Sequence, residues 1–278
     1  MVKGGPGFLA IVTLAAALTC GVLRAEPSGV IAPGPDFSAQ QVTAILFKAK
    51  SGERPDFAKR FLTYLDLAEL DFKGALLSGA DLYGSDFTGA NLAGADLSKT
   101  RMDRTVLIRA NLSDSNLTDA SILRPTIYSN DQDILTDAPS FNGANLTRVH
   151  VQANLSGADF RGATMTEAFF SPHETRTGAG TLSTLFSNVL KSCNFAGAHL
   201  HGAQFARAIL TFSRFNDADL TGVNFAEADL TKVDFSGADL TGADVTGADL
   251  YDANFSGAKG LETLKGLATA KNADKVVR

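Results

Sequence analysis

The histidines are the residues of this chain best suited to metal binding or acid–base chemistry. His199 and His201 flank Leu200 as an H-x-H pair, and His173 stands next to Glu174. A zinc site needs three or four histidine, cysteine or carboxylate ligands. The acids near these pairs are scattered, and no cysteine stands at ligand spacing. The sequence therefore predicts no metal site and no cofactor.

The sequence also lacks the motifs that mark common enzymes. It contains no nucleophile elbow, P-loop, dinucleotide-binding fingerprint or H-E-x-x-H motif. Its two cysteines are Cys20 and Cys193, so a chain without the first has no intramolecular disulfide. Cys193 occupies a small-residue position of the repeat described next and is interpreted as a core residue. We expect no enzymatic activity; an enzyme that uses His173 and Glu174 is the alternative.

A five-residue repeat with a large apolar residue at its centre dominates the chain. The series begins at Leu67, Phe72 and Leu77, and the unit reads A-(D/N)-(L/F)-(S/T)-G. A period of five fits neither an α-helix nor a β-strand, so the chain must turn once per unit. Glycine, serine and threonine suit such turns. The alanine two residues before the centre indicates an interior with no room for a second large side chain.

This pattern resembles that of the pentapeptide-repeat family. The resemblance implies an all-β fold over residues 65–260: a right-handed quadrilateral β-helix, in which four units form one coil. The centre and the small residue would point inward, and the other three positions would face water. The alternation of Leu and Phe between Leu190 and Phe255 favours four units, because centres 20 residues apart are then alike. A three-sided coil would mix Leu and Phe in every column.

The N-terminal segment predicts export. Lys3 precedes an uncharged run over residues 4–23, and Ala25 stands at a plausible cleavage point, so residues 1–25 resemble a signal peptide. The run is also long enough to span a bilayer, which makes anchoring by residues 4–23 an alternative. A lipoprotein signal around Cys20 is a third reading. All three predict an exported protein, periplasmic or extracellular. Its only expected membrane contact is through the N-terminal segment, if that segment is not cleaved.

The elements that flank the repeat are expected to join and close it. Residues 26–36 are rich in Pro and Gly and predict a linker. Residues 37–64 predict a helix over 38–50, with a capping box at Ser38 and Gln41, and a lead-in. This helix would cap the first coil, or it would serve as a recognition helix. Residues 261–278 predict a tail or cap that closes the last coil or pairs two copies as a homodimer.

Two interruptions of the repeat, near residues 128–140 and 171–183, predict loops that project from coil corners. Insertions of this kind often bind partners, although many are tolerated without a purpose. His173, Glu174 and Arg176 in the second loop are therefore candidates for an interaction surface.

The acidic C-terminal coils supply the other candidate residues: Asp219, Asp229, Asp239 and Asp249. From Asp66 to Lys259 the chain has 24 acidic and 14 basic residues, which argues against general nucleic-acid binding. Acidic coils resemble those family members that mimic DNA and bind gyrase. The simpler interpretation is that Asp is preferred before the centre and keeps the surface soluble.

These observations predict a non-enzymatic scaffold or interaction protein of the bacterial cell envelope, with an unknown protein partner. A DNA-mimicking, gyrase-binding protein is the alternative.

Overall fold

The computed structural model describes residues 34–130, 134–171 and 187–277. The predicted signal segment, most of the linker and most of the second interruption lie outside these residues. Residues Pro33–Arg278 form one compact unit, which is described below by itself. No helix within the described ranges is long and apolar enough to cross a bilayer.

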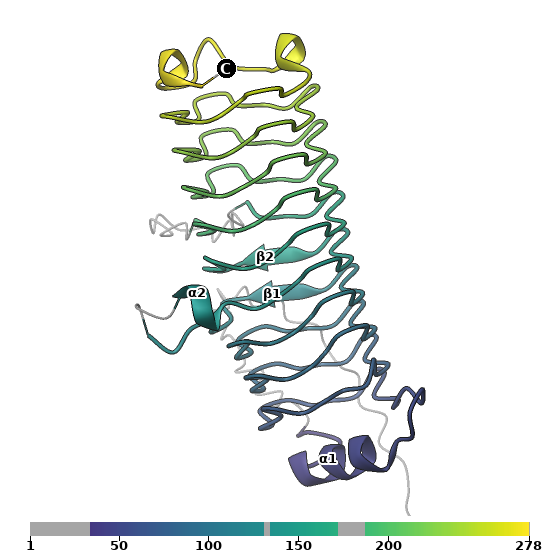
Figure 1. Ribbon diagram of the computed structural model, residues 1–278. Helices are drawn as coiled ribbons and strands as arrows, with labels where there is room; N and C mark the ends of the chain where they lie inside the picture. The colour runs from purple at the N-terminus through teal and green to yellow at the C-terminus, as the bar shows by residue number, and fades with distance from the viewer. Residues whose placement is uncertain (1–33, 131–133, 172–186, 278) are drawn as a thin grey trace, which may run out of the picture. The chain divides into compact units, whose positions relative to one another are not determined.

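The chain winds into a stack of coils that are joined by parallel β-bridges (Figure 1). In most of the stack a bridging residue pairs with the residue 20 positions later, as Asp81 does with Arg101. Twenty residues are four units, so a regular coil holds four. Each unit usually makes one bridge and then turns, so among the described residues formal strands occur only at β1 (Ser121–Leu123) and β2 (His150–Gln152), which pair in parallel.

The turns explain two positions of the repeat. The residue two after the centre has a left-handed backbone, with φ of 70° at Gly84 and 57° at Arg104. Glycine adopts this conformation without steric cost. The Asp or Asn before the centre accepts a hydrogen bond from the backbone N–H two residues later, as Asp86 does from Thr88 at 2.8 Å. The acidic ladders are therefore part of the turn structure.

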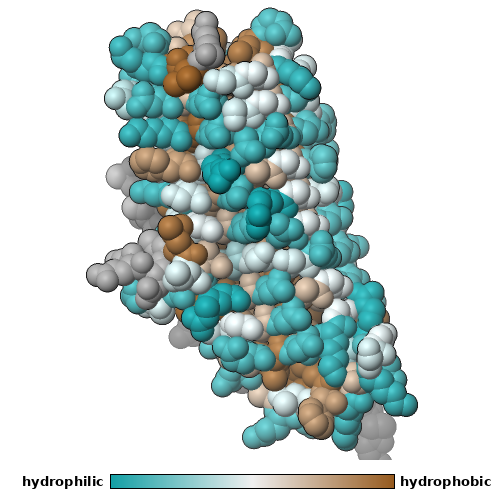
Figure 2. Space-filling model, viewed as in Figure 1, coloured by the Kyte–Doolittle hydropathy of each residue, from teal (hydrophilic) through white to brown (hydrophobic). Residues whose placement is uncertain are grey.

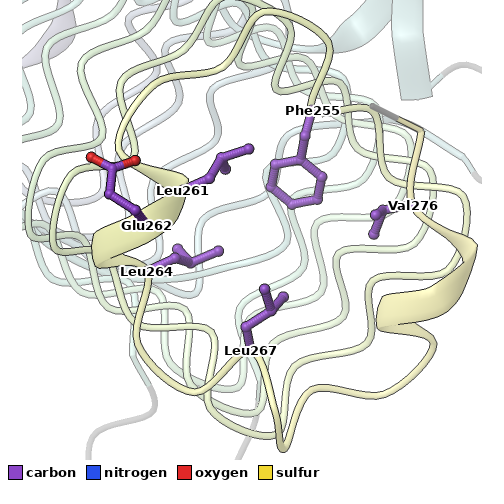
Figure 3. A pocket seen from close by; sticks show the side chains of 6 residues that line it. All are labelled: Phe255, Leu261, Glu262, Leu264, Leu267 and Val276. Carbon is purple, nitrogen blue, oxygen red and sulfur yellow. The ribbon is translucent and has the colours of Figure 1, made fainter.

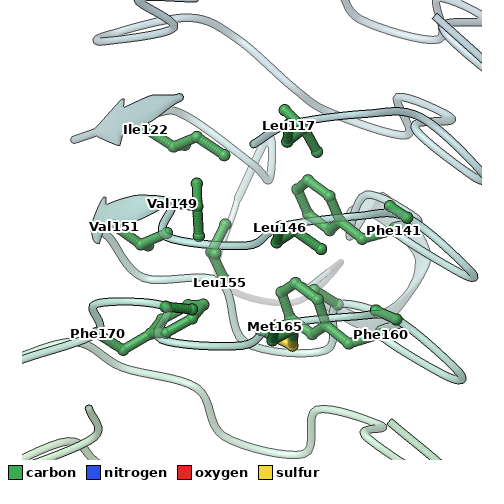
Figure 4. Packing of buried hydrophobic residues seen from close by; sticks show 14 of the residues in the cluster. Leu117, Ile122, Phe141, Leu146, Val149, Val151, Leu155, Phe160, Met165 and Phe170 are labelled. Carbon is green, nitrogen blue, oxygen red and sulfur yellow. The ribbon is translucent and has the colours of Figure 1, made fainter. Parts of the chain in front are cut away.

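Centres and small residues fill the interior of the stack, as Figure 4 shows for the middle coils. Phe141, Phe160, Phe195 and Phe215 are fully buried, and their successive ring centroids lie 4.9, 4.8 and 4.5 Å apart. A second column contains Ile122, Val151 and Phe170. Packing at this density and burial of this much apolar surface stabilise the stack.

The stack begins before residue 65, the boundary that the repeat pattern predicted. Asp56 already bridges to Leu76, and Phe57 and Leu62 are fully buried. Arg60 stands two residues before Leu62, where later units have alanine. The altered residues around these centres therefore hid the first coil from sequence analysis.

The stack also continues past residue 260, where a separate tail or cap was predicted. Four bridging residues at six-residue intervals form a further coil: Lys259, Lys265, Lys271 and Val277. Short 3-10 helices at Leu261–Thr263 and Ala273–Lys275 interrupt it. One extra residue per side removes the five-residue period, which is why the sequence pattern ended too early.

Helix α1 spans Ala39–Lys48 and begins one residue after the predicted start. The Ser38 hydroxyl accepts from the Gln41 N–H at 3.2 Å, and the Gln41 side-chain oxygen accepts from the Ser38 N–H at 2.7 Å. This is the predicted capping box. Val42 and Leu46 are buried in the same core cluster as the coil centres, so the apolar face of the helix contacts the stack.

The first interruption contains the short helix α2, Ile134–Asp137, where only a loop was predicted. The Asp137 carboxylate accepts hydrogen bonds from Arg109 Nη1 at 3.1 Å and from the Ser129 N–H and hydroxyl at 2.9 and 2.6 Å. The bonds from Ser129, followed by the ion pair with Arg109, hold the pKa of Asp137 below its usual value. The chain rejoins the stack at Ser140, which bridges to Asn111.

A register shift follows β2, where the centres Val151 and Leu155 are four positions apart instead of five. Val151 is a buried centre that the repeat pattern missed. The fully buried Asn188 closes the gap: its Nδ2 donates to the carbonyls of Val151 and Phe170 at 3.1 and 2.6 Å, and its Oδ1 accepts from the Ala153 N–H at 2.7 Å. One buried amide therefore satisfies three backbone groups.

Candidate interaction surfaces

The four predicted aspartates lie in two separate columns. Asp219 bridges to Asp239, and Asp229 bridges to Asp249. The two columns are ten residues, or two coil sides, apart along the chain. Each column ends at a lysine of the last coil, Lys259 in the first and Lys271 in the second. The structure therefore does not bring the four carboxylates together into one acidic patch.

All four carboxylates serve the turns that follow them. Asp219, Asp229, Asp239 and Asp249 accept from the backbone N–H two residues later at 3.0 to 3.1 Å. At Asp239, the hydrogen bonds from the Thr241 hydroxyl and N–H hold the pKa of the carboxyl below its usual value. These four side chains are half-buried, and their hydrogen bonds to the turns explain why the fold uses aspartate at these positions. Their role in binding a partner stays a prediction.

The histidines do not form a site in the described part of the chain. His199 and His201 are exposed, and His201 Nδ1 lies 2.7 Å from the Thr221 hydroxyl. Among the described residues there is no group of three or more potential metal ligands. His173, Glu174 and Arg176, the remaining candidates, lie outside the described residues.

Cys193 lies inside the stack, at a small-residue position. It is fully buried, and its Sγ lies 3.1 Å from the Leu155 carbonyl oxygen. Burial raises the pKa of this thiol to about 12. A neutral thiol without solvent access is a poor nucleophile.

A basic aromatic patch, defined by Tyr64, Tyr83, Arg101 and Arg104, lies near the start of the stack and was missed by sequence analysis. The rings of Tyr64 and Tyr83 meet edge to face with centroids 5.4 Å apart. The Arg101 guanidinium lies 4.5 Å from the Tyr83 ring centroid. Residues 20 positions apart share a column of the stack. The predicted repeat began at residue 65, so Tyr64 was not assigned to the same column as Arg104.

The interior and the repeat decide the family of this chain. The family model for pentapeptide repeats matches in eight copies, over residues 62–92, 85–122, 140–171, 189–226 and 218–257. The chain belongs to the pentapeptide-repeat family. Comparison with curated protein sequences found no match.

Solved pentapeptide-repeat structures resemble this one. HetL, which is involved in regulating heterocyst differentiation in the cyanobacterium Nostoc sp. strain PCC 7120, is 20% identical; the alignment covers 87% of this chain and 100% of HetL, with a TM-score of 0.50. A thylakoid-lumen pentapeptide-repeat protein of Arabidopsis thaliana is 34% identical over 36% of this chain and 66% of its own, with a TM-score of 0.28. A variant of the plasmid-mediated fluoroquinolone resistance protein QnrB1 is 18% identical. The alignment covers 77% of this chain and 92% of the QnrB1 chain, with a TM-score of 0.28. The likeness to HetL extends along the whole of that chain and supports the β-helical fold.

The C-terminal end of this pentapeptide-repeat stack has an apolar cavity of about 250 Å³ (Figure 3). Its lining comes from the last regular centre and from the final coil: Phe255, Leu261, Glu262, Leu264, Leu267 and Val276. Leu261, Leu264 and Leu267 pack against the core cluster. Figure 2 shows that the remaining surface seen from this side is largely hydrophilic, with hydrophobic residues in separate patches.

Proposed function

We propose that this pentapeptide-repeat protein is a non-enzymatic scaffold or interaction protein of the bacterial cell envelope. The observation that supports this most directly is the filled interior, in which every centre within the described residues, from Phe57 to Phe255, is at most 4% exposed. Ligand sites are usually concave pockets of several hundred Å³. A stack filled with side chains offers its outer faces and its ends instead, and such surfaces suit the binding of another protein.

The proposal includes the expectations for the two ends of the chain. Residues 1–25 export the protein, or residues 4–23 anchor it, because the segment has the features of a signal sequence. The stack is a right-handed quadrilateral β-helix, and α1 caps its first coil, which agrees with the buried Val42 and Leu46. The apolar cavity near Leu264 suits homodimer formation through the last coil.

The proposed location and role can be tested together. Subcellular fractionation of a C-terminally tagged chain, with the mature N-terminus read by mass spectrometry, should find a chain that starts near Glu26 outside the cytoplasm. Crosslinking from exposed faces of the stack should then capture one recurrent protein partner. An uncut chain in the cytoplasm would contradict the location, and a turnover activity that maps to the stack would contradict the non-enzymatic role.

A second candidate function is DNA mimicry with gyrase as the partner. The bridged pairs Asp219–Asp239 and Asp229–Asp249 motivate it, because they repeat negative charge along the C-terminal coils. A supercoiling assay tests this candidate: the purified protein should inhibit gyrase or protect it from a quinolone. Unchanged supercoiling over the full range of protein concentration would rule it out.

A further inference from the structure

The basic aromatic patch contains the residue types that contribute most to protein interfaces. Tyrosine and arginine are enriched among the few residues that supply most of the binding energy. Tyr64 is 71% exposed, a large value for an aromatic side chain. Arg104 is exposed, and among the described residues it has no ion-pair partner.

The Arg101 side chain of this patch is held in place by contacts within the stack. Arg101 Nε donates to Asp81 Oδ1 at 3.1 Å while the guanidinium lies over Tyr83, and neither Nη atom of Arg101 has a partner in the described chain. The carboxylate of Asp103, the residue before Arg104, already accepts hydrogen bonds from the Ser121 hydroxyl and the Leu123 N–H. A fixed guanidinium loses little side-chain entropy on binding. The two arginines can therefore take a carboxylate from outside.

The fold does not require these side chains. Tyr64 and Arg104 both have φ near 57°, at the same corner of the coil where Gly84 stands between them. A Cβ at Gly84 would lie 2.7 Å from Tyr64 Cδ1, so the tyrosine ring covers this glycine. A left-handed backbone is unfavourable for residues other than glycine. The ring is held at this corner, yet most of its surface stays in water.

We infer that the basic aromatic patch binds an acidic, extended segment of a protein partner. The inference rests on the proposed interaction role and specifies its surface and the chemistry of the partner. Carboxylates of the segment would accept bidentate hydrogen bonds from Arg101 and Arg104, and its apolar groups would pack on Tyr64. A nucleic acid fits less well, because two guanidinium groups stand on a repeat body with 24 acidic and 14 basic residues.

Fluorescence anisotropy with a labelled oligoglutamate peptide tests this inference on the purified mature chain. We expect binding that weakens as salt is added, because charge pairs at a surface are screened. Arg101→Gln combined with Arg104→Gln should weaken binding at least tenfold, and Tyr64→Asn, which tolerates the left-handed backbone, about fivefold. Lys232→Gln is the matched control, because this lysine lies over the ring of Phe212 at 5.5 Å in the acidic half of the stack.

Three results would overturn the inference: no binding of oligoglutamate, an equal loss with Lys232→Gln, or tighter binding of a single-stranded oligothymidylate than of the peptide. Crosslinking in cells separates its failure from that of the proposed function. If a partner crosslinks from other faces and the arginine variants do not affect it, the interaction role is supported and the binding role of the patch is contradicted. No partner from any face removes the interaction role itself.

Discussion

The N-terminal coils (residues 56–127) and the C-terminal coils (residues 188–257) differ in two features. Different side chains fill their interiors, and different residues form their turns. In one column, Leu92 and Leu112 occupy the places that Phe195 and Phe215 hold farther along. In the N-terminal coils ten charged or tyrosine residues and five glycines adopt the left-handed conformation, whereas in the C-terminal coils seven glycines and seven other residues adopt it. The same ladder runs through both halves, so it tolerates either filling. Surface chemistry is therefore set independently of the coil.

The strongest test of this comparison removes one centre from each half. Phe215→Ala should destabilise the protein by about 4 kcal/mol, and Leu112→Ala by about 3 kcal/mol, because each leaves a cavity in a filled interior. Phe215 stacks on Phe195 and Phe235 at 4.5 and 5.6 Å, so its loss also removes ring contacts. Urea denaturation measures both changes. A larger cost for Leu112→Ala would contradict the view that the phenylalanine column is the more tightly packed filling.

The boundary between the two halves depends on one buried amide. Asn188→Leu should cost roughly 2–4 kcal/mol, because it leaves the Ala153 N–H and two carbonyls without their partner in a buried place. Thermal or urea denaturation measures the loss. Asn194→Asp is the control, since a carboxylate there can still accept from the Ala196 N–H. Equal stability of Asn188→Leu and the parent would show that the register shift needs no polar closure.

The same boundary shows how much the sequence could predict. The unit A-(D/N)-(L/F)-(S/T)-G predicted the filled interior and the turns, because the same small, apolar and turn-forming residues recur in each unit. The alternation of Leu and Phe between Leu190 and Phe255 favoured four units per coil. Phe57, Val151 and the six-residue spacing from Lys259 were missed, because they keep the ladder but not the motif. Asn188 was missed because its partners lie 18 to 37 residues away. The same was true of the basic aromatic patch, which joins side chains from neighbouring coils.

The first insertion offers a test by pH. The pKa of Asp137 lies below its usual value in the folded protein, so its contribution is present above the ordinary carboxyl pKa and is lost as pH falls through the depressed one. At neutral pH, Asp137→Asn should speed hydrogen exchange over residues 134–137 about fivefold, because the Ser129 N–H and Arg109 lose a charged acceptor. Asp229→Asn, in the C-terminal coils, should leave that exchange unchanged. A variant that exchanges like the parent would contradict the anchoring role of Asp137.

The smallest effect is expected at Cys193, which the C-terminal coils use where other units use alanine. Cys193→Ala should cost less than about 1 kcal/mol, because alanine fills the same position elsewhere. Burial raises the pKa of the thiol to about 12. The stability gained from keeping the thiol neutral is thus complete below the pKa of the unfolded chain and is lost only as pH rises toward the folded value. Iodoacetamide followed by peptide mapping should modify this residue only in denaturant, whereas Ser192→Cys, one residue away on the exposed corner, should react in the native protein. Rapid native labelling of Cys193 would mean that the C-terminal coils open more readily than their stacked rings imply.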